Sequence, residues 1–289
     1  MSFLLCALLL PFCAGLSPLP DGGEKTASVP IIMYHSVCNG KPNAYVISPR
    51  TLEGDLVYLR EKGYTAVLTD DVVGFVENGK ALPEKPVMLT FDDGHYNFLS
   101  VVLPLIEKYE MKAVVSVVGD YTEREEGQQK RSDNYSRCAF ADLLPVPCNQ
   151  KRSDNYSYLN RDEIKELTSH SRAEVQNHSY GLHSGAGALP HNKESYEDYK
   201  TRLLEDLKKC DEIIKECGGN PTVFTCPFGK YGKFTVRAVK EAGYKAMLIC
   251  EEGVNRIEKG DLNALFRLKR FIRPSGKDSE CYFRKIGLN

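Results

Sequence analysis

The chain has 289 residues and the composition of an ordinary folded protein, with 42% hydrophobic and 27% charged residues. These values exclude a disordered, collagen-like or coiled-coil chain. Lys and Arg number 38 against 39 Asp and Glu, so the formal net charge is -1. Because no excess of positive charge exists, we expect neither a nucleic-acid partner nor an anionic membrane partner. The length suits two domains or one large α/β barrel.

Residues 3–16 form an apolar run that is too short to cross a membrane as an ordinary helix, so no transmembrane span is predicted. The run is typical of the core of a signal peptide, although an atypical or truncated one without a positive n-region. We therefore expect residues 1–28 to be a leader and linker, and the protein to be secreted or held at the cell surface. Lipoprotein anchoring through Cys13 is a weaker hypothesis. A buried N-terminal helix is the alternative, against which Pro11 argues.

From Val29 onward, short apolar runs alternate with amphipathic segments of helical period. Near-continuous apolar strands separated by helices indicate a parallel sheet that helices cover. Because no interior linker is present, we predict one α/β domain over 29–289, with a closed or nearly closed barrel. Strands are predicted at 29–37, 85–94, 112–120, 172–179, 221–229 and 245–253, and helices at 48–64, 97–111, 160–170, 195–219 and 233–244.

The octapeptide QKRSDNYS occurs twice, at Gln129–Ser136 and at Gln150–Ser157. Two copies are too few for a repeat fold, so we interpret the pair as a local duplication or an assembly error. Insertions cost little in surface loops, so we expect a surface insertion around 129–157.

The ten cysteines contain no CxxC pattern, which disfavours a zinc ribbon or a thioredoxin motif. Cys210 and Cys217 lie on one predicted helix, too far apart along its axis to bond to each other. Most cysteines are therefore expected to be small core residues.

The strand predicted at 85–94 ends in TFDDG, which places Asp92 and Asp93 side by side before Gly94. One carboxylate can hold a metal while the other handles a proton, and a plain turn is the alternative. The later segment NHSYGLHS adds His178 and His183, which either converge on one ion or lie on the surface. Together, one Asp and two His at the strand ends of a barrel form a set that binds a divalent ion with open positions.

These motifs, with VPIIMYHSV, TCPFGKYG and LKRFIRP in the same order, resemble the polysaccharide deacetylase family (carbohydrate esterase family 4, the NodB-like domain). The resemblance covers residues 29–289. It implies an irregular (β/α)-barrel that removes acetyl groups from an acetylated polysaccharide or oligosaccharide. The implied substrates are polymers of N-acetylglucosamine, such as peptidoglycan or chitin, and O-acetylated xylan.

The resemblance also implies roles for individual residues. Asp93, His178 and His183 match the ligands of a divalent metal, usually Zn²⁺, with Co²⁺, Ni²⁺ or Mn²⁺ as alternatives. Asp92 matches the general base, and the amide of Phe228 matches a donor to the oxyanion. These roles agree with the chemistry of amide or ester hydrolysis, which needs a Lewis acid, a base and oxyanion donors.

Three departures from the family pattern bear on the mechanism. Thr225 stands where the family often has an Arg, which leaves Asp92 without that charged partner. The late Leu-x-His motif that supplies the general acid has no counterpart, and the chain contains no Trp. His35 and His95 are the candidate acids, each with a purely structural role as the alternative. Arg270 either balances charge at the site or lies at the rim of the barrel.

We hypothesise an exported, metal-dependent carbohydrate deacetylase. A glycan-binding relic that no longer turns over is the rival, supported by the missing acid and the missing Trp. A purely structural metal is a third hypothesis, disfavoured because structural sites usually close with a fourth protein ligand. Asn177 heads a glycosylation sequon that we interpret as accidental, because a glycan there would obstruct His178.

Overall fold

The computed structural model describes residues 24–125, 154–155 and 157–289 of the chain. The apolar run at 3–16, with its leader and lipoprotein hypotheses, and the first copy of QKRSDNYS lie outside the described residues. In the described ranges, every helix is too short or too polar to cross a membrane.

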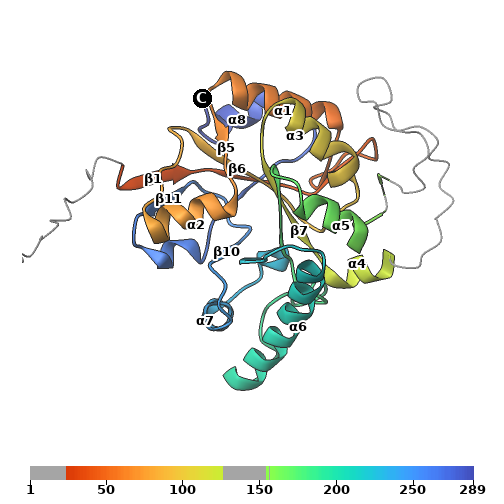
Figure 1. Cartoon of the computed structure of the whole chain (residues 1–289), viewed down its shortest axis with the longest axis vertical. Coiled ribbons are helices and arrows are strands. Elements are labelled where there is room, and N and C mark those ends of the chain that lie inside the picture. The colour runs from red at the N-terminus through yellow and green to blue at the C-terminus, as the bar shows by residue number, and fades with distance from the viewer. Residues whose placement is uncertain (1–23, 126–153, 156) are drawn as a thin grey trace, which may run out of the picture.

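A parallel sheet forms the centre of the fold and confirms the α/β class (Figure 1). Its strands are β2 (Ile31–Tyr34), β5 (Thr65–Ala66), β6 (Pro86–Phe91), β7 (Ala113–Val117), β8 (Ala173–Asn177), β9 (Val223–Thr225), β10 (Ala246–Leu248) and β12 (Phe271–Ile272). The order across the sheet is β10-β9-β8-β7-β6-β2-β12, and β5 pairs with β6. All six strands predicted from the sequence therefore contribute to this one sheet.

Backbone hydrogen bonds join the two edges of this sheet and curl it into an irregular barrel. The Leu268 amide donates to the Met247 carbonyl at 2.9 Å, and the Ile249 amide donates to the Leu268 carbonyl at 3.0 Å. The same segment continues into β12, which pairs with β2 at the opposite edge. Residues 268–272 thus connect both edges, and the predicted irregular (β/α)-barrel is confirmed.

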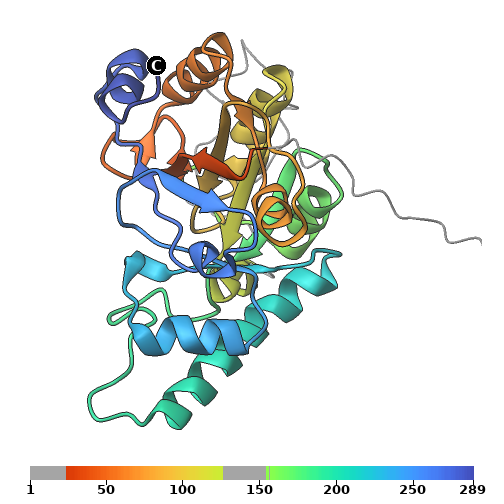
Figure 2. The same ribbon diagram turned by 90° about the vertical axis from the view of Figure 1, so that its left-hand side faces the viewer.

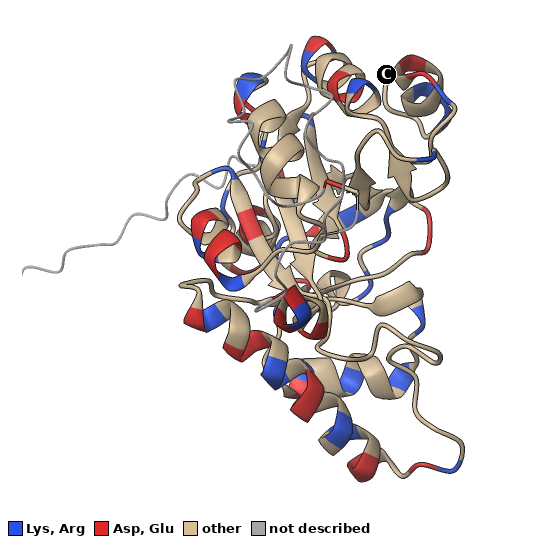
Figure 3. Cartoon of the chain, turned by 90° about the vertical axis from the view of Figure 1, so that its right-hand side faces the viewer, with Lys and Arg blue, Asp and Glu red and all other residues tan. Residues whose placement is uncertain are grey.

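Helices surround the barrel, and Figure 2 shows the two lowest, α6 and α7, side by side beneath it. The five predicted helices are present, and α2, α4 and α8 are additional. Figure 3 shows acidic and basic residues alternating along the outer surface of α6, in keeping with the balanced charge. The helices are α1 (Pro49–Glu61), α2 (Thr69–Asn78), α3 (Leu103–Lys108), α4 (Gly119–Glu125), α5 (Arg161–Thr168), α6 (Tyr196–Glu216), α7 (Lys233–Glu241) and α8 (Ser279–Lys285), with short turns η1 (Phe98–Val102), η2 (Pro227–Gly229) and η3 (Leu262–Leu265).

Two small sheets flank the barrel. β1 (Thr26–Val29) pairs antiparallel with β11 (Asn255–Glu258), and β3 (Ser36–Val37) pairs parallel with β4 (Val46–Ile47). Since β1 begins at Thr26, the first strand starts slightly before the domain boundary predicted at Val29.

The burial of strand β6 on both faces explains why its sequence is apolar almost throughout. Val87 and Leu89 pack in the core between the sheet and the helices α1, α3 and α5, whereas Met88 packs in a second core with Val114 of β7. A strand that is buried on both faces needs apolar residues at successive positions rather than alternate ones. The ends of such strands are therefore where polar side chains stand out.

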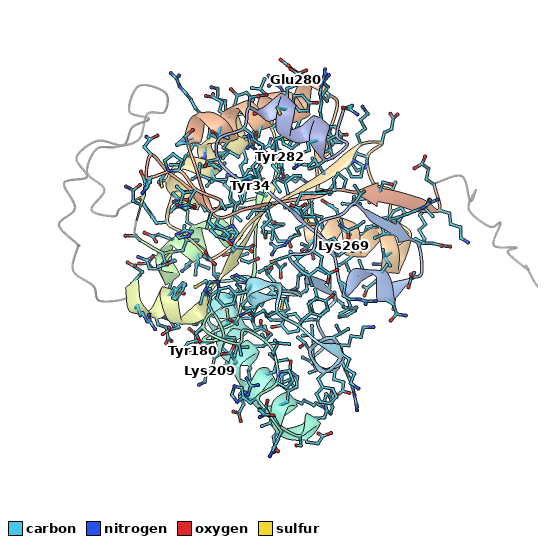
Figure 4. The ribbon with its side chains drawn as sticks, turned by 180° about the vertical axis from the view of Figure 1, so that it is seen from behind. Tyr34, Tyr180, Lys209, Lys269, Glu280 and Tyr282 are labelled. Carbon is cyan, nitrogen blue, oxygen red and sulfur yellow. The ribbon has the colours of Figure 1, made fainter. Side chains whose placement is uncertain are left out.

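A buried ion pair fixes the chain after β12 to helix α1. Arg273 donates from Nε and Nη2 to the two oxygens of Asp55 at 2.8 and 2.9 Å, and both side chains are fully buried. Tyr34 donates its hydroxyl to Asp55, and the ring of Tyr282 lies 4.6 Å from the guanidinium carbon; Figure 4 labels both tyrosines. This pair anchors the segment that closes the barrel.

No disulfide joins two of the described cysteines, and most of them are buried in the core, as expected. Cys210 and Cys217 do not bond to each other.

Candidate active site

A pocket of about 490 Å³ lies at the carboxyl end of the barrel strands, where such folds place their functional residues. Six of the residues singled out in the sequence line it: His35, Asp92, Asp93, His178, His183 and Phe228. His95 and Arg270 lie behind the lining, in contact with Asp93 and Asp92 respectively. The other lining residues are Met33, Tyr45, Cys250, Glu252 and Ile272.

Asp93, His178 and His183 converge at one point of this pocket, with ligand atoms all within 4.8 Å of one another. The Oδ1 atom of Asp93 lies 3.0 Å from Nε2 of His183 and 3.4 Å from Nε2 of His178. The same Oδ1 atom is buried, and no hydrogen-bond partner is found for it among the described residues. The spatial convergence predicted from the sequence is therefore present.

The groups next to the Nδ1 atoms of His178 and His183 bear on whether the three side chains can bind a cation. The Nδ1 atom of His178 lies 2.7 Å from the Thr225 carbonyl, which only accepts hydrogen bonds, so Nδ1 carries the proton. In the neutral ring, Nε2 then presents a lone pair to the Asp93 carboxylate. The Nδ1 atom of His183 lies 3.2 Å from the Tyr121 hydroxyl. A lone pair and a carboxylate attract each other only with a proton or a metal ion between them; Asp93 favours the proton by raising the pKa of His178, and the residues present also suit a divalent metal.

The backbone is strained where these side chains converge. Asp93, Ser179 and Phe228 adopt positive φ angles of 72°, 73° and 56°, which residues other than glycine seldom do. Such conformations cluster at functional sites, where the surrounding structure maintains them. At Gly94, also with positive φ, an added Cβ would lie 3.1 Å from the Cα of Val117. The turn after β6 therefore requires glycine there.

Asp92 has a buried charged partner, contrary to the expectation raised by Thr225. Arg270 donates from Nη1 and Nη2 to its two oxygens at 2.6 and 2.8 Å, and the side chains are 0% and 3% exposed. Burial alone would raise the pKa of Asp92, but the charge and hydrogen bonds of Arg270, together with the charges of His178 and His35, hold the pKa below its usual value. A place for Arg270 at the rim is therefore wrong, and charge balance is the correct alternative.

The two candidate acids have different surroundings. His35 lines the pocket, its Nδ1 atom is buried without a hydrogen bond from the described residues, and Tyr45 packs on its ring at 4.8 Å. Burial lowers the pKa of His35, against the opposing charges of the two aspartates. The Nε2 atom of His95 instead lies 3.5 Å from Oδ2 of Asp93. The structural alternative therefore fits His95, whereas His35 faces the pocket.

The turn η2 shapes one wall of the pocket. The amides of Gly229 and Lys230 donate to the carbonyls of Cys226 and Pro227, both at 3.1 Å, so the amide of Phe228 takes no part in those turn bonds. The Phe228 ring is 47% exposed and lies 4.5 Å from the ring of His183. Phe228 thus lies beside the candidate metal site.

Some residues at or beside the pocket carried no signal in the sequence. Tyr121, Tyr45 and Glu252 belong to no motif, and only the fold brings them to the site.

The side chain of Asn177, which heads the glycosylation sequon, donates its amide to the Leu207 carbonyl and to Asp211. Because Asn177 is fully buried, its sequon is not available in the folded protein, which supports our interpretation of it as accidental.

The sequence is similar to a known protein family and to individual named proteins. The family model described as polysaccharide deacetylase matches residues 79–247. The protein YxkH of Bacillus subtilis (strain 168), which carries a provisional polysaccharide deacetylase name, is 23% identical over 91% of this chain and 78% of its own. Poly-beta-1,6-N-acetyl-D-glucosamine N-deacetylase of Escherichia coli (strain K12) is 28% identical over 77% of this chain. The match spans only 34% of that protein's length.

Solved structures share the fold. A de-N-acetylase from Aggregatibacter actinomycetemcomitans superposes with a TM-score of 0.67 at 24% identity, over 89% of this chain and 100% of the other. The Streptococcus pyogenes deacetylase PplD has a TM-score of 0.65 at 19% identity, over 90% and 98%. His35 and Arg270 both lie outside the residues that the family model matches, but the fold places His35 in the pocket lining and Arg270 against Asp92 behind it. The chain belongs to the polysaccharide deacetylase family.

Proposed function

We propose that this protein is a metal-dependent hydrolase that removes acetyl groups from a polymer of N-acetylglucosamine. The observation that carries the proposal is the convergence of Asp93, His178 and His183 beside an Asp92 that Arg270 keeps ionised. The amide linkage is preferred to the ester of acetylated xylan, because the Escherichia coli relative is named for an N-deacetylase activity.

Asp93, His178 and His183 would hold the ion, for which Zn²⁺ is our first choice and Co²⁺, Ni²⁺ and Mn²⁺ are alternatives. When bound, a divalent ion acts as a Lewis acid toward the acetyl carbonyl and lowers the pKa of water. Three protein ligands leave positions open, which favours a catalytic site over a structural one.

Asp92 is proposed as the general base that takes the proton of the attacking water. Its two oxygens are held by Arg270, so its orientation is fixed and the ionised form is favoured. The amide of Phe228, outside the bonds of its own turn, is proposed as a donor to the negative oxygen that forms on the acetyl carbon.

The proton that Asp92 takes from water is proposed to pass to His35, whose lowered pKa makes it a ready general acid toward the departing amine. His35 lines the pocket with both aspartates. The chain has no late Leu-x-His motif that could supply the acid instead. This assignment weakens the rival hypothesis of a glycan-binding relic, since it removes the missing acid and leaves only the missing Trp as support.

Acetate release from acetylated N-acetylglucosamine oligomers, by purified protein with added Zn²⁺ or Co²⁺, tests the proposal. We expect activity that a chelator abolishes and that Asp92→Asn and His178→Ala each remove. Activity that survives both substitutions together would refute the assignment. Saccharide binding without acetate release would favour the relic, and a fold that melts when metal is removed would indicate a structural ion. The export predicted from residues 3–16 stays a prediction.

A further inference from the structure

A second cavity of about 710 Å³ lies next to the active-site pocket, between α7 and the segment around η3; Figure 2 shows η3 directly above α7. We call it the basic groove. Two chain segments contribute to both cavities: Gly229 and Glu251 line the groove, while their neighbours Phe228 and Glu252 line the pocket. A chain molecule seated in the pocket, if long enough to pass these residues, would reach the groove. The groove is lined by Leu189, Gly229, Lys230, Tyr231, Gly232, Lys233, Val236, Lys240, Glu251, Asn263, Phe266 and Arg267.

The groove concentrates positive charge that the chain as a whole does not have. Four exposed cations line it, against the single carboxylate of Glu251, although the net charge of the protein is -1. In the described part of the chain, two of these cations have polar contacts, both to uncharged groups: Lys230 donates to the Gly185 carbonyl at 2.9 Å and Lys240 to Asn263 at 2.6 Å. The four cations are Lys230, Lys233, Lys240 and Arg267.

The arrangement of the groove suits a sugar with a negative group. Lys233, Val236 and Lys240 are spaced so that they share one face of α7. Across from them Phe266 is buried, with the Lys240 ammonium 4.6 Å from its ring. Tyr231 contributes a second aromatic ring and donates its hydroxyl to Glu251. Aromatic and apolar walls with a few charged groups at the edge are the usual composition of a ligand site.

We propose that the basic groove binds phosphate or carboxylate substituents on the sugar units next to the one that is deacetylated. The inference rests on the proposed function and adds a substrate class, namely acetylated glycans that carry negative charge. A neutral polymer gains no charge attraction from the four cations. A unit that has already lost its acetyl group carries an ammonium, which the cations repel.

The test compares three sets of oligomers that share one N-acetylglucosamine backbone: neutral, carboxylate-bearing and phosphate-bearing. Acetate release is measured as separate kcat and KM values at low and high salt. We expect a KM about tenfold lower for at least one anionic set, at unchanged kcat, with the difference shrinking at high salt. The two anionic sets distinguish carboxylate from phosphate.

The double variant Lys233→Gln/Arg267→Gln should lose this KM difference while its kinetics on neutral oligomers stay the same. Its matched control is Lys208→Gln/Arg256→Gln, which removes the same charge from exposed positions outside the groove. Equal KM values for neutral and anionic oligomers, or a difference that persists in the groove variant, would overturn the proposal.

A binding measurement separates this inference from the proposed function. Titration calorimetry of the intact protein with phosphate- or carboxylate-bearing oligomers that lack acetyl groups needs no turnover. Binding that the groove variant weakens about tenfold and the control variant does not would support the groove, even if no acetate were released from any oligomer. Indistinguishable affinities of wild type and groove variant would refute it.

Discussion

Arg270 holds Asp92 through two hydrogen bonds of 2.6 and 2.8 Å, although the two residues are 178 positions apart in the chain. Arg270→Met would leave a buried carboxylate without its partner, so we expect the free energy of unfolding to fall by about 3–5 kcal/mol. The double variant with Asp92→Asn should recover part of this loss. Denaturant unfolding measures both.

Arg273→Met is the control for that prediction, because Arg273 pairs with the equally buried Asp55 but lies outside the pocket lining. We expect a similar loss of stability from it, with acetate release retained under conditions where the variant is folded. Equal losses of activity in folded Arg270→Met and folded Arg273→Met would contradict a special role for Arg270.

Tyr121→Phe removes the hydroxyl that lies 3.2 Å from Nδ1 of His183. Because such partners orient a ligating imidazole, we expect metal affinity to fall about tenfold while the fold is unchanged. Titration against a competing chelator measures the affinity. Tyr109→Phe, which loses a hydroxyl bonded to Glu53, should leave the affinity unaltered.

Glu174 makes stability depend on pH. Burial, with a smaller contribution from the Asp70 charge, raises the pKa of Glu174 to about 8. The folded state therefore keeps a proton that the unfolded chain releases above its ordinary pKa of 4.5. Stability should fall as the pH rises from 4.5 toward about 8 and then level off.

Urea unfolding at several pH values checks this expectation. Glu174→Gln should flatten the dependence and make the protein more stable than wild type at pH about 8, by at most a few kcal/mol. The groups around the carboxyl are the amide of Gln176, the hydroxyl of Thr69 and the backbone of Asp70. An unchanged slope in the variant would show that Glu174 is not the titrating group.

Gly94→Ala combines a positive φ with a steric clash. Its φ is 68°, and the new Cβ would lie 3.1 Å from the Cα of Val117. Gly63 offers the matched control, since it has a φ of 77° and nothing within 4 Å of its Cβ position. We expect Gly63→Ala to cost about 1 kcal/mol, from the backbone conformation alone. Gly94→Ala should cost clearly more and also weaken metal binding, because Asp93 precedes it.

Much of the barrel could be predicted because its buried strands are apolar at successive positions. Helix α2 was missed, since Val72, Val73 and Gly74 have low helix propensity, which their burial against the core compensates. The clustering of Asp93 with the histidines could be predicted because parallel strand ends meet at one end of a barrel.

The partner of Asp92 could not be found in the same way. At Thr225, the resemblance to the family indicates only that an Arg is missing. Arg270 reaches the site because residues 268–272 join both edges of the sheet, and such a long-range pairing leaves no periodic signal. The position of Tyr121 beside His183 likewise depends on how helix α4 packs rather than on any motif.

The late position of residues 268–272 in the chain also affects when the active site can be completed during synthesis. Asp92 leaves the ribosome 178 residues before Arg270. At typical elongation rates this delay is on the order of ten seconds or more. Until then the barrel has an open edge and the carboxylate lacks its counterion, so a nascent chain can contain every metal-ligating residue and still have no finished site.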